Sequence, residues 1–166
     1  TTQSPQVAAG YQPSEVVFVQ NTGGELTAPQ LRTDPIRSIP NNSVRSLYLT
    51  RRGAFYEALM GGVIIVPEGQ SDFEWLSLWQ RVAQSSPIGS SRFDLKPTTI
   101  LPTADAAVAD SFRELARFRA EAVPVLDGDE AGEKYVADLI AGTPAPSQVI
   151  RYGQDAAVEC LSAWIL

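Results

Sequence analysis

The chain has 166 residues, of which 44% are apolar, and its 19 acidic and 13 basic residues give a formal net charge of −6. This length allows one domain with a sizeable core, and no apolar run reaches the roughly 18 residues that a membrane span needs. The sequence contains no histidine, and Cys160 is its single cysteine. Disulfide frameworks, Cys/His zinc sites, Ser-His-Asp triads and Cys-His nucleophiles are therefore excluded within this chain. A lone thiol fits a reducing compartment, so we expect a cytoplasmic protein without a membrane segment.

Residues 1–50 predict a small β-rich segment. Residues 16–19 form a short apolar run, and the Asn-Thr-Gly-Gly sequence at 21–24 is a strong turn signal before residues 25–27, so we expect a hairpin. Three prolines then interrupt regular structure until about residue 45. We separate this segment, 1–50, from a domain that covers residues 51–166.

From residue 51 onward, helical and strand patterns alternate. We expect strands at 62–66, 98–101, 122–126 and 148–152, and helices at 51–60, from 71, at 105–119, at 130–141 and from 154. This alternation predicts an α/β fold with a parallel sheet and helices on both faces. Ser71 and Glu74 have the spacing of a capping box, which places the second helix start at Ser71. Pro67 and Pro124 suggest strain or edge positions for their strands.

Two acidic clusters follow predicted strands directly. Glu68 and Asp72 come after the strand at 62–66, and Asp127, Asp129 and Glu130 come after the strand at 122–126. The carboxyl ends of parallel strands form one edge of the sheet, where ligands bind. Carboxylates gathered there raise one another's pKa values unless a cation joins them, and oxygen donors favour Mg²⁺, Mn²⁺ or Ca²⁺.

Simpler interpretations exist for each cluster alone. One acidic turn after a strand is most often a solvated loop or a helix cap, and only the pair of clusters, each with a glycine, favours a shared site. Thr103 and Asp105 follow the strand at 98–101 and occupy the same edge by position. Three arginines at 113, 117 and 119 have the helical spacing of a solvated face.

The two acidic motifs together resemble the TOPRIM signature. The sequence Val-Ile-Ile-Val-Pro-Glu-Gly at 63–69, with Asp72, precedes Pro-Val-Leu-Asp-Gly-Asp at 124–129. Within TOPRIM proteins, the stretch at 52–60 and the Asp-Gly-Asp-Glu-Ala-Gly sequence at 127–132 are similar to the OLD (overcoming lysogenization defect) nucleases. Residues 1–5 resemble the end of an ABC-type ATPase domain, although Gln3 replaces the usual histidine, and the chain has no P-loop motif.

The resemblance implies a TOPRIM, Rossmann-like fold and a metal-dependent DNA endonuclease, the nuclease half of an OLD-family ATPase-nuclease. Glu68, Asp72, Asp127 and Asp129 would be catalytic and would bind Mg²⁺ or Mn²⁺, in the manner of two-metal sites with ions about 3.5–4 Å apart. Ca²⁺ would be a non-catalytic occupant. Glu130 would be a further metal ligand, and Gly69, Thr103 and Asp105 would contact DNA or the edge of the site.

The implied partners are DNA, the ATPase domain of the same full-length chain, a UvrD-type helicase, and a second copy bound through the ATPase half. Residues 1–15 are then expected to be a remnant of that ATPase domain. The two lysines, Lys96 and Lys134, do not match the lysine that OLD nucleases place late in this region. We therefore expect the chain to continue past Leu166 to a basic residue that completes the site.

Other functions fit the same pattern. The chain could be a non-catalytic TOPRIM module that mediates protein or nucleic-acid contacts, or a TOPRIM enzyme of the primase or ribonuclease type. Receiver-like and haloacid-dehalogenase-like domains also place acids at strand ends. The phosphatase motif of the latter requires threonine or valine where this chain has Ala131.

Overall fold

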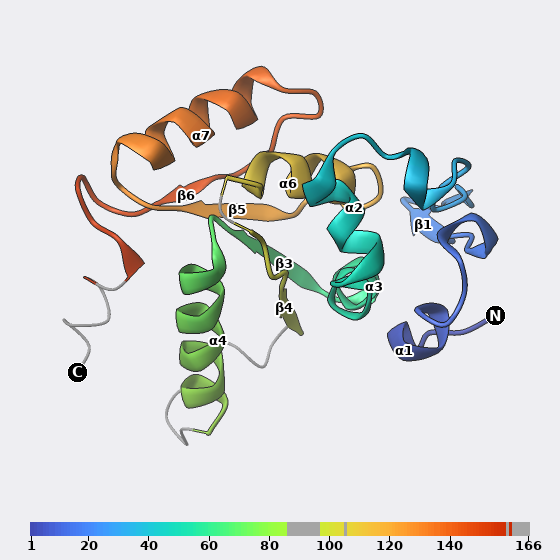
Figure 1. Cartoon of the computed structure of the whole chain (residues 1–166). Coiled ribbons are helices and arrows are strands. Elements are labelled where there is room, and N and C mark those ends of the chain that lie inside the picture. The colour runs from blue at the N-terminus through green and yellow to red at the C-terminus, as the bar shows by residue number, and fades with distance from the viewer. Residues whose placement is uncertain (86–96, 105, 159, 161–166) are drawn as a thin grey trace.

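A parallel sheet is the centre of the molecule (Figure 1). The computed structural model describes residues 1–85, 97–104, 106–158 and 160. The sheet has four strands in the order β4-β3-β5-β6. Their bounds are β3 (Val63–Pro67), β4 (Thr98–Ile100), β5 (Val123–Leu126) and β6 (Ile150–Arg151). The strands expected from the alternating pattern are confirmed, and all are parallel to their neighbours.

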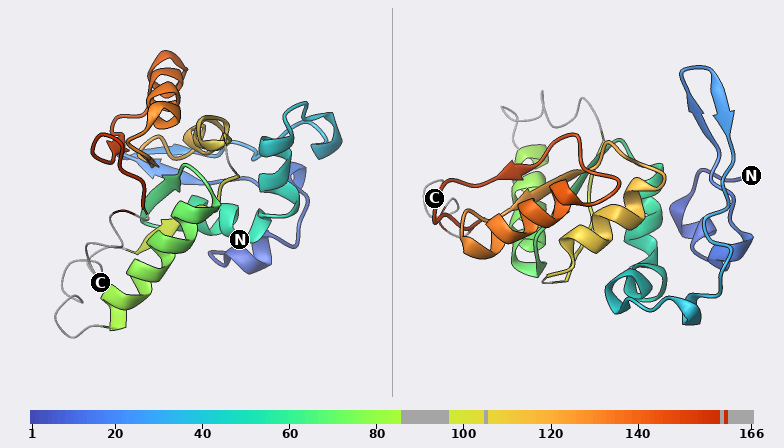
Figure 2. Two further views of the ribbon diagram at one scale, coloured as in Figure 1. Left: turned by 60° about the vertical axis from the view of Figure 1, so that its left-hand side comes forward. Right: turned by 90° about the horizontal axis from the view of Figure 1, so that it is seen from above.

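Helices cover both faces of this sheet, as the sequence predicts. They are α3 (Arg52–Met60), α4 (Gln70–Ser85), α6 (Val108–Ala116) and α7 (Glu130–Ala141). Helices α6 and α7 lie on one face and α4 lies on the other (Figures 1 and 2). The helix expected from residue 154 falls mostly outside the described residues. None of the described helices is long and apolar enough to cross a membrane.

The register of the two inner strands determines which residues meet at the carboxyl edge. Pro67 of β3 pairs with Val125 of β5, so the residues that follow the two strands emerge side by side. The suggestion that these prolines mark edge strands is wrong, because β3 and β5 are the inner strands. Pro124 is tolerated there because β6 is short and pairs with β5 only from Val125 onward, so the missing N–H of Pro124 is opposite no residue of β6.

The N-terminal segment contains less β structure than expected. The hairpin is present, but its first strand is β1 (Gln20–Thr22) rather than the apolar run at 16–19, and its second strand is β2 (Glu25–Thr27). It extends away from the sheet (Figure 2). However, helix α2 (Asn42–Leu49) begins within the stretch expected to be irregular until about residue 45. The physical reason is a helix cap: the Asn41 side chain accepts hydrogen bonds from the backbone N–H groups of Ser43 and Val44, which stabilises a helix start directly after Pro40. The remaining short elements are α1 (Pro5–Ala8), η1 (Pro13–Glu15) and η2 (Ile36–Ser38).

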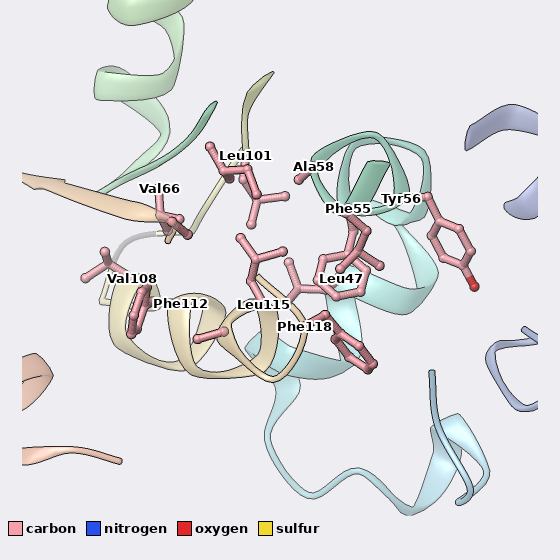
Figure 3. Packing of buried hydrophobic residues seen from close by; sticks show 14 of the residues in the cluster. Leu47, Phe55, Tyr56, Ala58, Val66, Leu101, Val108, Phe112, Leu115 and Phe118 are labelled. Carbon is pink, nitrogen blue, oxygen red and sulfur yellow. The ribbon is translucent and has the colours of Figure 1, made fainter. Parts of the chain in front are cut away.

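One apolar core includes residues from the N-terminal segment and from the sheet domain. Leu31 and Leu47 are fully buried in the same cluster as Phe55, Phe112 and Leu115. Figure 3 shows α2 and α3 contributing side chains that pack toward α6. Burial of large apolar side chains contributes about 1.5–3 kcal/mol each, so the first 50 residues add directly to the stability of the domain that they precede.

A buried ionic network reinforces this junction. The Glu114 carboxylate of α6 accepts hydrogen bonds from Arg32 at 3.0 Å, from Arg117 at 2.6 Å, and from the Tyr48 hydroxyl of α2. Burial, followed by the Glu114 charge, raises the pKa of the Tyr48 phenol above its ordinary value. The arginines expected on a solvated face are therefore partly structural, since Arg117 belongs to this network and Arg119 donates to the carbonyls of Leu59 and other residues at the end of α3.

Candidate functional site

The carboxyl ends of β3 and β5 open into a pocket of about 180 Å³. Three carboxylates line it, those of Glu68, Asp72 and Asp127. The other lining residues are Gly69, Ser71, Ala106, Tyr135 and Val158. The structure therefore brings together three of the predicted acids, two from the first motif and one from the second.

Asp72 is the buried member of the group. Its residue is only 4% exposed, and its Oδ2 accepts a hydrogen bond from the N–H of Gly69 at 3.2 Å. Its Oδ1 is buried without a hydrogen-bond partner. A buried oxygen in this state is costly unless a ligand or cation satisfies it.

The start of α4 explains why Asp72 faces the pocket. The expected start at Ser71 is wrong: α4 begins at Gln70, and Gly69 accepts the first helical hydrogen bond, from Phe73 at 3.2 Å. Glycine has no side chain that could cap the helix. Asp72, the third helical residue, instead bonds back to the N–H of Gly69, which directs its carboxylate toward the end of β3.

Glu68 connects the two acidic turns. It follows Pro67 directly, and its Oε2 accepts a hydrogen bond from the backbone N–H of Asp127 at 3.0 Å. The turn after β3 is thereby joined to the turn after β5. This contact places the Glu68 carboxylate at the backbone of the residue whose side chain lines the same pocket.

The charges in this pocket influence one another. The pKa of Asp72 is raised from 3.8 to about 7, first by burial and then by the charges of Asp127 and Glu68. The hydrogen bond from Gly69 opposes this rise. The protonated form of Asp72 is therefore populated at a much higher pH than for an ordinary aspartate, and a bound cation would favour the ionised form.

Of the three acids in the second motif, only Asp127 lines the pocket. Asp129 is the N-cap of α7, and its Oδ1 accepts a hydrogen bond from the N–H of Gly132 at 2.8 Å. Glu130 is exposed and pairs with Lys134 at 2.8 Å. Neither lines the pocket. The expectation that Asp129 and Glu130 join the other carboxylates is therefore not met by this arrangement, because α7 begins directly after Asp129 and uses its side chain as a cap.

The remaining predicted site residues differ in their roles. Gly69 lines the pocket and supplies the N–H that holds Asp72. Thr103 is fully buried, and its hydroxyl donates to the carbonyl of Pro67 at 2.6 Å, so it supports the end of β3. Asp105 lies outside the described residues, although its neighbour Ala106 lines the pocket.

Sequence reasoning missed two residues at this edge. Tyr135 lines the pocket from α7. Arg151, at the end of β6, donates hydrogen bonds to the carbonyls of Gly128 at 2.7 Å and Asp129 at 3.1 Å. A basic side chain of this chain therefore contacts the turn after β5, which the search for a matching lysine did not reveal. The signal was present, because residue 151 belongs to a predicted strand of the same sheet and ends that strand at the same edge.

The donor set suits a divalent cation in its chemistry. Mg²⁺, Mn²⁺ and Ca²⁺ prefer carboxylate oxygens, and the unsatisfied Oδ1 of Asp72 is a ready donor atom. As the side chains are placed, however, no group of three or more His, Cys, Asp or Glu residues within the described ranges is arranged to hold a metal ion. The pocket thus offers the right oxygen atoms without a complete, preformed ligand set.

Comparison with protein families, with curated proteins and with solved structures finds no match to this chain. The assignment of an α/β architecture therefore depends on the strands and helices of the structure alone. The TOPRIM resemblance stands on the motifs at residues 63–72 and 124–132 and remains a hypothesis about the family.

Proposed function

We propose that the pocket binds Mg²⁺ or Mn²⁺ and that the chain is the nuclease region of an OLD-type protein, which hydrolyses phosphodiester bonds of DNA. The observation that supports this most is the meeting of Glu68, Asp72 and Asp127 in one pocket, with the pKa of Asp72 raised to about 7. Such a raised pKa is characteristic of carboxylates gathered for catalysis or cation binding. In this proposal DNA, an ATPase domain and a UvrD-type helicase are partners, and the site works in the cytoplasm.

A divalent cation bound here would lower the pKa of a water molecule and offset charge on the phosphate. The residues of the chain prepare the pocket for it. Asp72 would supply its unsatisfied Oδ1 and would give up its proton on cation binding, which would couple binding to proton release. Glu68 and Asp127 add two further carboxylates, and the hydrogen bond from the Asp127 N–H orients Glu68.

Direct titration with Mn²⁺ tests this proposal. We expect calorimetry to show Mn²⁺ binding by the wild-type chain, with proton release that depends on the buffer. Asp72→Asn and Asp127→Asn should abolish binding, whereas the exposed Glu130→Gln should leave it unchanged and serves as the matched control. A wild-type chain that binds no Mn²⁺ at millimolar concentration would contradict the proposal.

A non-catalytic TOPRIM-type module is the second candidate. It is favoured by the lack of a preformed metal-binding group within the described ranges. Such a module would gain stability from Asp72→Asn through relief of repulsion, and its contacts with protein or DNA would be unchanged. A plasmid cleavage assay with the protein that contains this chain separates the two candidates, since only the nuclease loses activity in that variant.

A further inference from the structure

Arg151 is a basic residue whose side chain contacts the turn after β5. Its guanidinium donates to three successive backbone carbonyls: to Asp127 at 3.4 Å, to Gly128 at 2.7 Å and to Asp129 at 3.1 Å. Arg151 ends β6 and pairs in register with Leu126, the last residue of β5. It therefore reaches across from the neighbouring strand to the turn that follows.

The same turn is also held by the backbone of the residues that follow β6. The N–H of Gly128 donates to the carbonyl of Ala156 at 2.7 Å, and the N–H of Asp155 donates to the carbonyl of Gly128 at 3.1 Å. A Cβ atom at Gly128 would lie 1.7 Å from the carbonyl oxygen of Gly153. The backbone of residues 153–156 thus packs directly against Gly128, and no side chain fits between them.

We propose that Arg151 is a positioning residue, which holds the turn at residues 127–129 so that the Asp127 carboxylate stays in the pocket with Glu68 and Asp72. Its importance for metal binding rests on the proposed function. The N–H of Asp127 that orients Glu68 belongs to the same turn. Loss of the Arg151 contacts would therefore loosen two of the three pocket carboxylates together.

The guanidinium group suits this task because its planar fork carries five N–H donors and can serve several carbonyls together. A lysine keeps the charge but donates from a single point. Arg151→Lys therefore separates positioning by hydrogen bonds from a simple effect of charge, and Arg151→Met removes both.

Arg113 is the matched control. It donates to the carbonyl and carboxylate of Asp138 at 2.9 Å and 2.7 Å, in the last turn of α7, and neither residue lines the pocket. Like Arg151, it fastens the backbone of one element from another. Arg113→Met therefore removes an equivalent clamp without touching residues 127–129.

Hydrogen exchange of the metal-free chain tests the positioning. In Arg151→Met we expect the amides of Asp127, Gly128 and Asp155 to exchange about tenfold faster, since loss of the Arg151 hydrogen bonds makes local opening of the turn more frequent. Arg113→Met should leave these three amides as protected as in the wild type. Unchanged exchange in Arg151→Met would overturn the proposal without reference to any metal.

Mn²⁺ affinity tests the consequence. We expect Arg151→Met and Arg151→Lys each to weaken Mn²⁺ binding by about tenfold or more, as loss of residues that orient metal ligands does, and Arg113→Met to bind as the wild type does. Wild-type affinity in Arg151→Lys would show that charge alone matters and would overturn the positioning role. If the wild type binds no Mn²⁺, the proposed function fails, while the exchange measurement still decides whether Arg151 holds the turn.

Discussion

The turns after β3 and β5 carry similar sequences, Glu-Gly-Gln-Ser-Asp and Asp-Gly-Asp-Glu, yet their acids have different roles. In the first turn both acids, Glu68 and Asp72, line the pocket. In the second only Asp127 does so, while Asp129 caps a helix and Glu130 faces solvent. The difference shows that each acid after a strand has to be assigned separately, according to its position relative to the start of the next helix.

The position of each acid relative to the helix start explains the division. A capping box has two reciprocal hydrogen bonds, one from the cap residue and one from the third helical residue. Helix α4 has the second, in which the N–H of Gly69 donates to the Asp72 carboxylate. Helix α7 has the first, in which the N–H of Gly132 donates to the Asp129 carboxylate. The third-residue acid points back to the strand end and into the pocket, whereas the cap acid points along the helix.

The largest expected effect is on catalysis. Asp127→Asn and Glu68→Gln should lower metal-dependent DNA cleavage by more than about 100-fold, because even residues that only orient metal ligands are worth 10–100-fold. Asp129→Asn should keep at least a third of the activity, since asparagine caps a helix as well as aspartate does. Initial rates of supercoiled plasmid cleavage, with circular dichroism as the check on folding, measure this. If Asp129→Asn lowered the cleavage rate as much as Asp127→Asn, the different roles assigned to these two acids would be contradicted.

The close packing of the second turn should appear as a loss of stability. Gly128→Ala places a Cβ 1.7 Å from a backbone oxygen, and we expect a cost of about 3 kcal/mol in the free energy of unfolding, at the upper end for overpacking. Gly53→Ala, in helix α3 with no atom near its Cβ position, should be neutral or stabilising by up to about 1 kcal/mol. Urea denaturation of both variants measures the contrast, and equal stabilities would contradict the packing of this turn.

Asp72 should make stability depend on pH. Its pKa is raised from 3.8 to about 7 in the folded chain, so protonation favours folding and this contribution is lost as the pH rises from about 4 to 7. We expect Asp72→Asn to stabilise the chain by about 2 kcal/mol at pH 8, half of what the full shift converts to, because the pocket opens to water. The gain should shrink toward zero near pH 4.

Thermal melts of Asp72→Asn and the wild type across this pH range provide the measurement. Asp138→Asn, which alters an exposed carboxylate of α7, is the control and should show no such gain at pH 8. Mn²⁺ should raise the melting temperature of the wild type and leave that of Asp72→Asn unchanged. A gain at pH 4 equal to that at pH 8 would show that repulsion and burial of the charge are not the cause.

The smallest effects concern the two acids outside the pocket. Asp129→Ala should cost about 1 kcal/mol of stability through loss of the helix cap, whereas Glu130→Ala, which removes only an exposed ion pair with Lys134, should change stability by less than about 0.5 kcal/mol. Chemical denaturation distinguishes the two values. A larger loss in Glu130→Ala than in Asp129→Ala would contradict the assignment of the cap.

Much of the architecture is readable from local patterns. The β-branched run at 63–66, the apolar stripes of the helices and the Asn-Thr-Gly-Gly turn each depend on neighbours in sequence, and the corresponding elements are found close to their expected bounds. Helix α2 was not predicted because the prolines before it indicated irregular structure. Its start depends on a single side chain, that of the cap residue Asn41. The burial of Glu114 with Tyr48 and Arg32 joins residues far apart in sequence, and no local pattern announces such contacts.

By itself the sequence determined the kinds of chemistry available and the order of the elements. The absence of histidine, the single cysteine and the acids that follow two apolar runs are properties of composition and spacing. Only the tertiary structure decided which acids meet. Each residue along a helix turns the side chain by about 100° around the axis, so Asp72, the third residue of α4, faces the pocket, whereas Asp129, directly before α7, is its cap. Only strand pairing brought Arg151 to the turn after β5, because that contact depends on which strand lies beside which.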